Sequence, residues 1–144
     1  MPLHLIKLCV GVDSIDELAD WQRRRAAEQR KRGKKPVLRH RTRSMPQRRD
    51  EVLDGGSLYW VIKGLVQVRQ KIIGLVPVTD KEGGSMCEIR YAPRLIRVEL
   101  RPQRPFQGWR YLEADAAPPD LVRGAKADNL PGAMAAELRS LGLL

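Results

Sequence analysis

The most apolar run of the chain is residues 55–64, GGSLYWVIKG, which has glycines at both ends. Successive side chains of a β-strand point to opposite faces of a sheet. One face of a strand here would carry Leu58, Trp60 and Ile62, and the other would carry Tyr59, Val61 and Lys63. Because β-branched and aromatic residues are enriched in strands, we predict that this run is the central strand of a small β-rich core.

Further strand-like runs lie on both sides of this strand. They cover residues 3–10, 65–78, 86–91, 95–101 and 109–112. Single glycines at positions 64 and 74 interrupt the longest run, and strands bent at such points are typical of strongly curved sheets. The sequence therefore predicts an α+β fold with a curved, mostly antiparallel, barrel-like sheet and helices at its periphery.

Three helices are expected around this sheet. Ser14 and Glu17 match a capping box, so a helix should run over about residues 15–32, docked by its first half and projecting into solvent by its second. A short helical turn can begin at Pro46, and a C-terminal helix is expected at about residues 130–142. We expect the 144 residues to form a single domain.

The positive charge of the chain is concentrated in one segment. The formal net charge is +10, but residues 23–49 alone contain thirteen Lys or Arg and one acid, Glu28, for a local net charge of +12. One-sided charge of this kind is typical of proteins that bind a polyanion, nucleic acid above all. An anionic membrane surface and a solvated arm that serves solubility are the alternatives.

Several other classes of function lack the residues that they need. Cys9 and Cys87 have no partner at metal-binding spacing, so we expect two free thiols in a reducing cytoplasm, no metal and no cofactor. No apolar run has the length of a membrane-spanning helix, and we expect no signal peptide. The expected protein is therefore cytoplasmic and has no membrane partner.

The candidates for catalysis are four titratable residues, His40, Asp50, Glu51 and Asp54. The chain has no GxSxG, P-loop or HExxH motif. Asp50, Glu51 and Asp54 can in principle supply an acid and a base, and Asp50 and Asp54 would share one face of a short helix. Neutralisation of Arg48, Arg49 and their neighbours by these carboxylates is the stronger alternative. The charges of Arg39 and Arg41 would disfavour protonation of His40.

A nucleic-acid-binding surface has more support in the sequence. Arg39, Arg41 and Arg43 alternate, so an extended backbone would place three guanidinium groups on one side. Five of the seven aromatic residues lie at positions 59–60 and 106–111, and single-strand recognition combines arginines with flat rings. The candidate nucleic-acid-binding residues are Arg39, Arg41, Thr42, Arg43, Arg48, Arg49, Tyr59, Lys63, Arg104, Gln107 and Trp109. We expect a cleft between the basic segment, the strand at 59–63 and the loop at 104–109.

Four blocks of the sequence resemble an uncharacterised family of alphaproteobacterial proteins, known as a domain of unknown function. They are residues 3–11, 41–46, 54–64 and 104–112, and the resemblance covers roughly residues 3–121. It implies a bacterial cytoplasmic protein and no established activity.

The order of the elements is also similar to that of PUA-like domains, including the EVE and ASCH groups. In those domains a short helix leads through a glycine turn into a hydrophobic strand, a place that residues 55–60 would occupy here. The turn in this chain is Asp-Gly-Gly-Ser rather than the more usual Gly-Asp, and the aromatic cage of the modified-base readers is not matched residue by residue. The resemblance implies a curved β-barrel that binds RNA or modified bases.

RNA binding without catalysis is the leading hypothesis, with structured or modified RNA among the expected partners. An enzyme that acts on nucleic acid or nucleotides is the first alternative. A protein–protein adaptor, in which the aromatic residues meet a protein partner, is the second.

Overall fold

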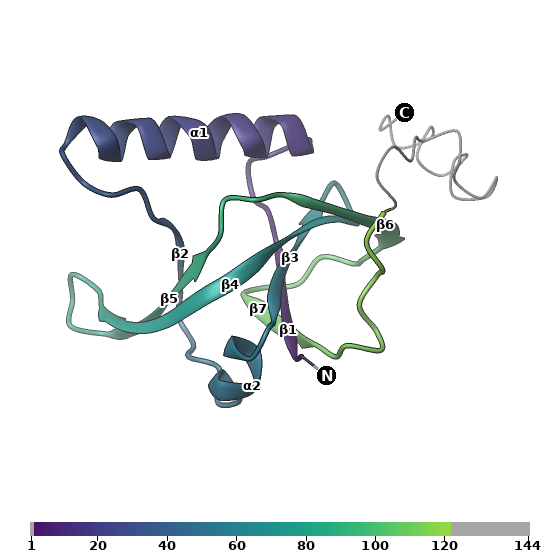
Figure 1. Ribbon diagram of the computed structural model, residues 1–144. Coiled ribbons are helices and arrows are strands. Elements are labelled where there is room, and N and C mark those ends of the chain that lie inside the picture. Colours follow the sequence, from purple (N-terminus) through teal and green to yellow (C-terminus); the bar gives the residue numbers. More distant parts are fainter. Residues whose placement is uncertain (1, 122–144) are drawn as a thin grey trace.

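The computed structural model describes residues 2–121, which form a curved sheet with a long helix across one end (Figure 1). The helices are α1 (Ile15–Lys31) and α2 (Arg49–Leu53). The strands are β1 (His4–Leu8), β2 (Leu38–Thr42), β3 (Ser57–Ile62), β4 (Leu65–Thr79), β5 (Ser85–Tyr91), β6 (Ile96–Pro102) and β7 (Trp109–Leu112). The helix expected at about 130–142 lies outside the described residues. Neither described helix has the length and apolar character that a bilayer crossing needs.

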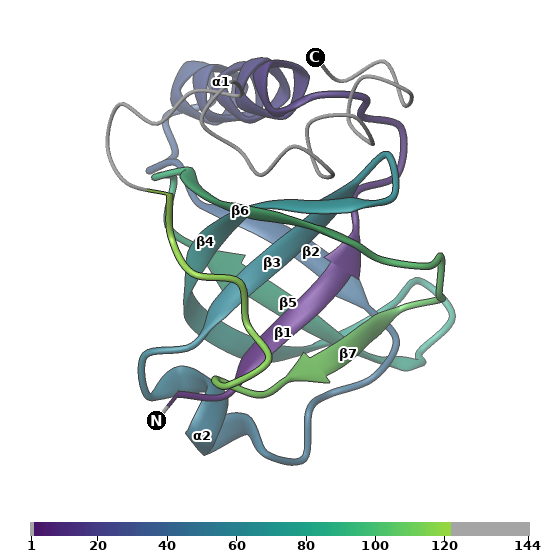
Figure 2. The ribbon, with the colours of Figure 1, turned by 90° about the vertical axis from the view of Figure 1, so that its right-hand side faces the viewer.

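The seven strands form one mixed sheet. Its order is β2-β5-β4-β3-β1-β7, and β6 pairs with β4. β1 and β3 run parallel, whereas the other paired strands of the described chain are antiparallel. The expected α+β fold with a mostly antiparallel sheet is therefore confirmed. The sheet coils strongly (Figure 2), but its end strands β2 and β7 are not paired with each other within residues 2–121, so it is not closed into a barrel.

A tight turn at Lys63 and Gly64 reverses the chain between β3 and β4. Both residues have positive φ angles, 49° and 75°, and Ile62 pairs with Leu65 across the turn. Two-residue hairpin turns need this backbone conformation. The expectation of one strand that bends at Gly64 and continues is therefore wrong. Lys63 lies in the turn of a hairpin and not on a strand face beside Tyr59.

Gly74 does mark a bend, as expected. β4 changes partners along its length: residues 65–69 pair with β6, and residues 72–79 pair with β5. The register shifts between Ile72 and Gly74. Such irregularities bend a strand and increase its twist, which allows one long strand to serve two parts of the coiled sheet.

Both faces of β3 are buried. The main core includes Leu58, Trp60 and Ile62, as the alternation predicted. The opposite face packs in a second cluster, whose buried members are Ile6, Tyr59, Val61, Val66, Val98 and Phe106. Only 3% of Tyr59 is exposed, because β6 and the loop that carries Phe106 cover this face. The expectation that Tyr59 belongs to a binding surface is corrected accordingly.

The first half of α1 docks on the main core. The Ser14 hydroxyl accepts a hydrogen bond from the backbone N–H of Glu17 at 3.1 Å, which confirms the expected N-cap. Leu18 and Gln22 are buried. The side chains of Gln22 and Gln70 exchange two hydrogen bonds of 2.9 and 2.8 Å, and the Trp60 indole N–H donates to the same Gln70 oxygen at 2.9 Å. A buried amide pair thus joins α1 to β4.

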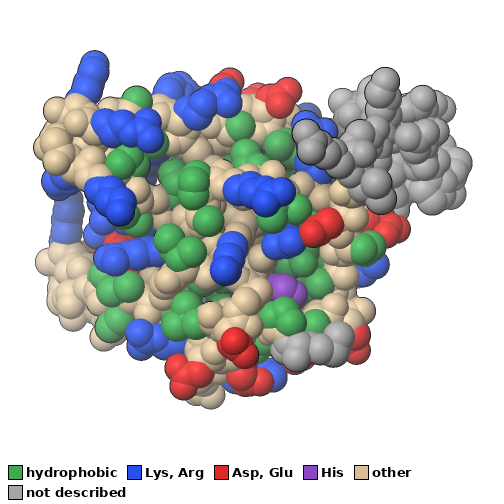
Figure 3. All heavy atoms as spheres, viewed as in Figure 1, with side chains coloured by type: hydrophobic (Ala, Val, Ile, Leu, Met, Phe, Trp, Pro, Cys, Tyr) green, Lys and Arg blue, Asp and Glu red, His purple; other side chains and the backbone are tan. Residues whose placement is uncertain are grey.

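Positive charge predominates over part of the surface. On the face seen in Figure 3, many Lys and Arg side chains lie over α1 and the sheet below it, although Asp and Glu side chains also lie on α1, and a further group of Asp and Glu side chains lies at the bottom, over α2. The three candidate carboxylates of residues 50–54 are all exposed there. The concentration of positive charge expected from residues 23–49 is thus carried mainly by α1, β2 and the segments next to them.

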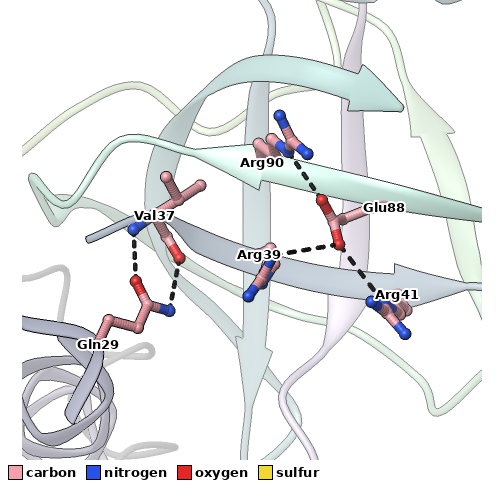
Figure 4. Close-up of polar contacts among 6 residues, drawn as sticks. All are labelled: Gln29, Val37, Arg39, Arg41, Glu88 and Arg90. Atoms are coloured by element: carbon pink, nitrogen blue, oxygen red, sulfur yellow. Dashed lines mark hydrogen bonds and ion pairs between the residues drawn. The ribbon is translucent and has the colours of Figure 1, made fainter. Parts of the chain in front are cut away.

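The second half of α1 is tied to the segment before β2. The Gln29 side chain donates to the Val37 carbonyl at 3.1 Å and accepts from the Val37 N–H at 2.7 Å (Figure 4). The Lys and Arg side chains around this contact remain exposed. The basic segment therefore continues from a helix into a strand through a defined contact, and the second half of α1 is not a free projection.

Candidate functional site

An open groove of about 990 Å³ lies between two segments that are distant in the sequence. One wall is formed by residues 41–45 and Gln47, at the end of β2 and beyond it. The other is formed by residues 107–109 and Tyr111, at the start of β7. Lys7 of β1 and Met86 of β5 complete the lining. The groove corresponds to the cleft expected between the basic segment and the 104–109 loop, with β1 in the place expected for residues 59–63.

Strand pairing places the lining residues of the groove, and two hydrogen bonds join its walls. Thr42 pairs with Cys87 on β5, and Lys7 pairs with Trp109 on β7. The indole N–H of Trp109 donates to the Ser44 carbonyl at 2.8 Å. The Arg48 backbone N–H donates to the Tyr111 hydroxyl at 3.0 Å. Two hydrogen bonds therefore connect the irregular wall to β7.

The groove is electropositive. Its charged lining residues are Lys7, Arg41 and Arg43, and none of the described residues that line it is Asp or Glu. Burial lowers the pKa of Lys7, although the neighbouring Cys9 opposes this effect. A nearby anion favours the charged form of a lysine, so an anion in the groove would oppose the effect of burial on Lys7.

Aromatic side chains stand next to these cations. The rings of Trp109 and Tyr111 meet edge to face, with centroids 4.9 Å apart and an interplanar angle of 71°. Both side chains are half-buried, so part of each ring faces the groove. The amides of Gln47 and Gln107 add hydrogen-bond donors and acceptors on the two walls.

Arg48 pairs with Glu51, as the sequence allowed for the carboxylates of residues 50–54, and also with Glu113, which the sequence did not predict. Its guanidinium group donates to both oxygens of Glu51, at 2.6 and 2.8 Å, and to Glu113 at 3.0 Å. It also lies 5.6 Å from the centroid of the Tyr111 ring. The hydrogen bonds that Arg48 donates to Glu51 and Glu113 raise the pKa of Arg48, and the one to Glu51 lowers the pKa of Glu51. Arg48 thus links α2 to β7, and two carboxylates offset its charge.

The candidate nucleic-acid-binding residues divide into two groups. Those that line the groove are Arg41, Thr42, Arg43, Gln107 and Trp109. Those that lie elsewhere are Arg39, Arg48, Arg49, Tyr59, Lys63 and Arg104. Arg49 is exposed at the start of α2, and Arg104 is exposed in the loop before β7. Arg39 points to the outer face of β2, where it approaches Glu88 at 3.8 Å.

Sequence reasoning missed Lys7, Ser44, Gln47 and Tyr111 as groove residues. Lys7 interrupts an apolar strand, which was the signal that the sequence offered, but its position opposite Trp109 depends on the pairing of β1 with β7. Tyr111 belonged to the aromatic cluster noted in the sequence. Its hydroxyl contact with Arg48 follows only from the fold.

The candidate catalytic residues do not converge. Asp50, Glu51 and Asp54 are exposed on α2 and directly after it. His40 lies on the inner side of β2, with its ring 5.9 Å from that of Trp60 and edge to face with it. It lines a separate cavity of about 370 Å³, and none of these three carboxylates is among the residues that line this cavity.

The protonation of His40 is disfavoured, as expected, but for a different reason. Burial lowers its pKa to about 4, with a further contribution from the charge of Lys7. Arg39 and Arg41 project to the other face of the strand, where both contact Glu88. His40 is therefore neutral at pH 7 because it is removed from water.

Comparison with known proteins identifies the family of the chain. The sequence model of the family described as protein of unknown function (DUF1489) matches residues 5–144. No curated protein and no solved structure matches the chain. Since the match covers nearly the whole chain, the protein belongs to the DUF1489 family.

Proposed function

We propose that this protein binds RNA in the groove between residues 41–47 and 107–111, without catalysing a reaction. The observation that carries the proposal is the lining of the groove. Three cations, with no carboxylate among the described lining residues, stand beside two half-buried aromatic rings. Proteins that bind single-stranded RNA combine these features, because cations attract phosphates and rings stack on bases.

Each group has a part in this interaction. Arg41 and Arg43 bind phosphate oxygens through their planar guanidinium groups, and Lys7 acts as a point charge at the base of the groove. Trp109 stacks on a base that is turned out of the strand. Gln107 reads the edge of that base through its amide. The hydrogen bond between Trp109 and Ser44 holds the ring in place before RNA arrives.

A salt titration tests the proposal. The binding of a mixed-sequence single-stranded RNA oligonucleotide is measured by fluorescence anisotropy at several salt concentrations. Affinity should fall steeply with salt, because each bound phosphate contributes about −0.7 to the slope of log K against log salt for single strands. R43A should weaken binding and reduce that slope, whereas R94A, an exposed arginine outside the groove, should change both much less.

Two outcomes of this titration count against RNA binding. One is an absence of binding at low salt. The other is an affinity that does not depend on salt. Crosslinking in cells, followed by sequencing of the recovered RNA, then identifies the RNA and distinguishes structured or modified RNA from other species.

An enzyme and a protein–protein adaptor remain alternatives with less support. The four candidate catalytic residues lie on two separate parts of the fold. An adaptor would present an apolar patch on the face opposite the basic segment. A largely apolar groove of about 840 Å³ lies beside α1 and Ile73, but it is bordered by Arg23, Arg30 and Lys35 of that segment.

We also infer a relationship to PUA-like domains. It is supported by the order of the elements, in which α2 leads through Gly55 and Gly56 into the aromatic strand β3, and by the strong coiling of the sheet. A structure of another family member that matches PUA-like domains in its strand order would support the relationship, and one with a different strand order would oppose it. The free thiols of Cys9 and Cys87 favour the cytoplasm as the location, which cell fractionation tests.

A further inference from the structure

We infer that the outer face of β2 and β5 extends the RNA-binding site as a second phosphate-binding surface, in which Glu88 is a positioning residue for Arg39, Arg41 and Arg90. The inference rests on the proposed binding of RNA. It assigns a role to a buried carboxylate and to two arginines, Arg39 and Arg90, that do not line the groove.

The four side chains come from facing positions of two antiparallel strands (Figure 4). Arg41 pairs with Glu88, and Arg39 pairs with Arg90. One Glu88 oxygen, Oε1, lies 3.5 Å from Nε of Arg41 and 3.8 Å from a terminal nitrogen of Arg39. The other, Oε2, accepts a hydrogen bond from Nε of Arg90 at 2.8 Å. One carboxylate therefore contacts three guanidinium groups.

This arrangement resolves a conflict between like charges. Directly opposed like charges destabilise a pair of strands, and Arg39 faces Arg90 across β2 and β5. The negative charge of Glu88 lies between them. Burial alone would raise the pKa of Glu88, but the hydrogen bond and charge of Arg90, the charge of Arg39 and the hydrogen bond of Arg41 lower it overall. Glu88 is therefore ionised at neutral pH, and the cluster keeps a net positive charge.

Glu88 is covered by the arginines and not by the core. Glu88 is only 1% exposed, although its side chain lies on the outer face of β5. The side chains of Arg39, Arg41 and Arg90 are 44%, 54% and 40% exposed. Each guanidinium group carries more N–H donors than its contact with Glu88 uses. The remaining donors face solvent from side chains that are already ordered, which reduces the entropy lost when a ligand binds.

Neighbouring backbone also supports one of these arginines. Gly74 pairs with Arg90 across β4 and β5 at the bend of β4. A Cβ atom at Gly74 would lie 3.6 Å from the Cβ and Cδ atoms of Arg90, so the stem of Arg90 lies flat against this glycine. The stem is thus held along its length, and Glu88 sets the direction of its guanidinium group.

The surface is continuous with the groove. Arg41 contacts Glu88 and also lines the groove. An RNA backbone that leaves the groove past Arg41 would meet Arg39 and Arg90 next. The ligand chemistry is that of phosphodiesters, because ordered guanidinium groups with free donors match phosphate oxygens.

The variant E88Q tests this role because two explanations predict opposite changes in RNA affinity. If only net charge matters, the removal of a carboxylate makes the protein more positive and tightens RNA binding. If Glu88 orders the arginines, E88Q lets them separate, so binding weakens by roughly three- to tenfold and the salt slope falls by about 0.7 for each phosphate that is no longer bound. The matched control is E113Q, which removes an exposed carboxylate from Arg48, outside the cluster, and should bind RNA at least as tightly as the wild type.

The outcomes separate the two levels of the proposal. Weaker binding by E88Q but not by E113Q supports the positioning role. If the wild type binds RNA and E88Q binds it as tightly as E113Q does, the positioning role is overturned, but the groove proposal is not. A wild-type protein that does not bind RNA overturns both. If circular dichroism shows E88Q to be unfolded, R90K replaces it: the charge is kept but the planar fork is removed, so weaker binding supports the role and unchanged binding overturns it.

Discussion

The indole N–H of Trp109 donates a hydrogen bond of 2.8 Å to the backbone carbonyl of Ser44. This bond joins the two walls of the groove, since Trp109 begins β7 and Ser44 follows β2. The same ring meets Tyr111 edge to face. One side chain therefore shapes the groove and also offers a surface on which a base can stack.

Substitution of Trp109 separates these two roles. W109F keeps an aromatic ring but loses the donor to Ser44, whereas W109A loses both. We expect W109A to reduce RNA affinity by about 1–3 kcal/mol, the usual contribution of one stacked base, and W109F to have a smaller effect. Fluorescence anisotropy measures both affinities.

The control for these variants is W21A on α1, where Trp21 is 36% exposed. It should leave RNA affinity within about twofold of the wild type, because Trp21 does not line the groove. Equal losses of affinity in W21A and W109A would show that stacking at this groove is not the cause.

The buried pair Gln22–Gln70 should contribute strongly to stability. Q70L leaves both the Gln22 amide and the Trp60 indole N–H without their partner, and each such group costs about 1–3 kcal/mol. We expect Q22L to reduce the free energy of unfolding less than Q70L does, since Gln70 keeps its contacts with Trp60 and with the Ala92 carbonyl. Urea unfolding measures the free energy of each variant.

The double variant Q22L/Q70L completes the cycle. Because the two residues share hydrogen bonds, its destabilisation should be smaller than the sum of the single effects. Strict additivity would contradict a direct coupling between α1 and β4 through this pair.

Stability should depend on pH between about 4 and 6.5 because of His40. Its pKa in the folded protein is about 4, lowered first by burial, whereas an unfolded histidine titrates near 6.5. The unfolded chain therefore binds more protons in this window, so stability is complete above it and falls as the pH decreases. The decrease approaches about 3 kcal/mol at the low end.

Urea unfolding at pH 7.5 and pH 5 measures this effect, with H40Q as the comparison. Burial also lowers the pKa of His4, but His4 is present in both proteins, so its contribution cancels. A wild-type protein whose stability falls no more than that of H40Q would contradict the assignment to His40.

Replacement of Lys63 by asparagine should stabilise the folded protein. Its φ angle of 49° is in the left-handed region, which costs an ordinary L-residue about 1–2 kcal/mol and which asparagine tolerates better. K63N followed by Gly64 matches the preferred hairpin turn. We expect a gain of about 0.5–1 kcal/mol in the free energy of unfolding.

The same variant tests the position of Lys63 relative to the groove. K81N removes an equal charge from the exposed turn between β4 and β5. The two variants should bind RNA equally well if Lys63 is outside the binding surface. A decrease of RNA affinity in K63N but not in K81N would show that Lys63 belongs to the binding surface.

The sequence by itself determined the features that depend on neighbouring residues. Ser14 caps α1, Gly74 bends β4, and the apolar alternation of β3 places Leu58, Trp60 and Ile62 in the core. These features follow from local hydrogen bonding, backbone freedom and the two-residue period of a strand.

Only the tertiary structure decided which faces and charges are open to a ligand. Alternation assigns Tyr59 to one face of β3 but cannot tell that Phe106 and Val98 will cover that face. A run of arginines predicts positive charge, but Glu113 pairs with Arg48, and Glu88 contacts Arg39 and Arg41, although both carboxylates are far along the chain. The pairing of β1 with β7 likewise brings Lys7 to Trp109. Burial and charge are properties of three-dimensional neighbours, which strand pairing selects and a linear pattern does not contain.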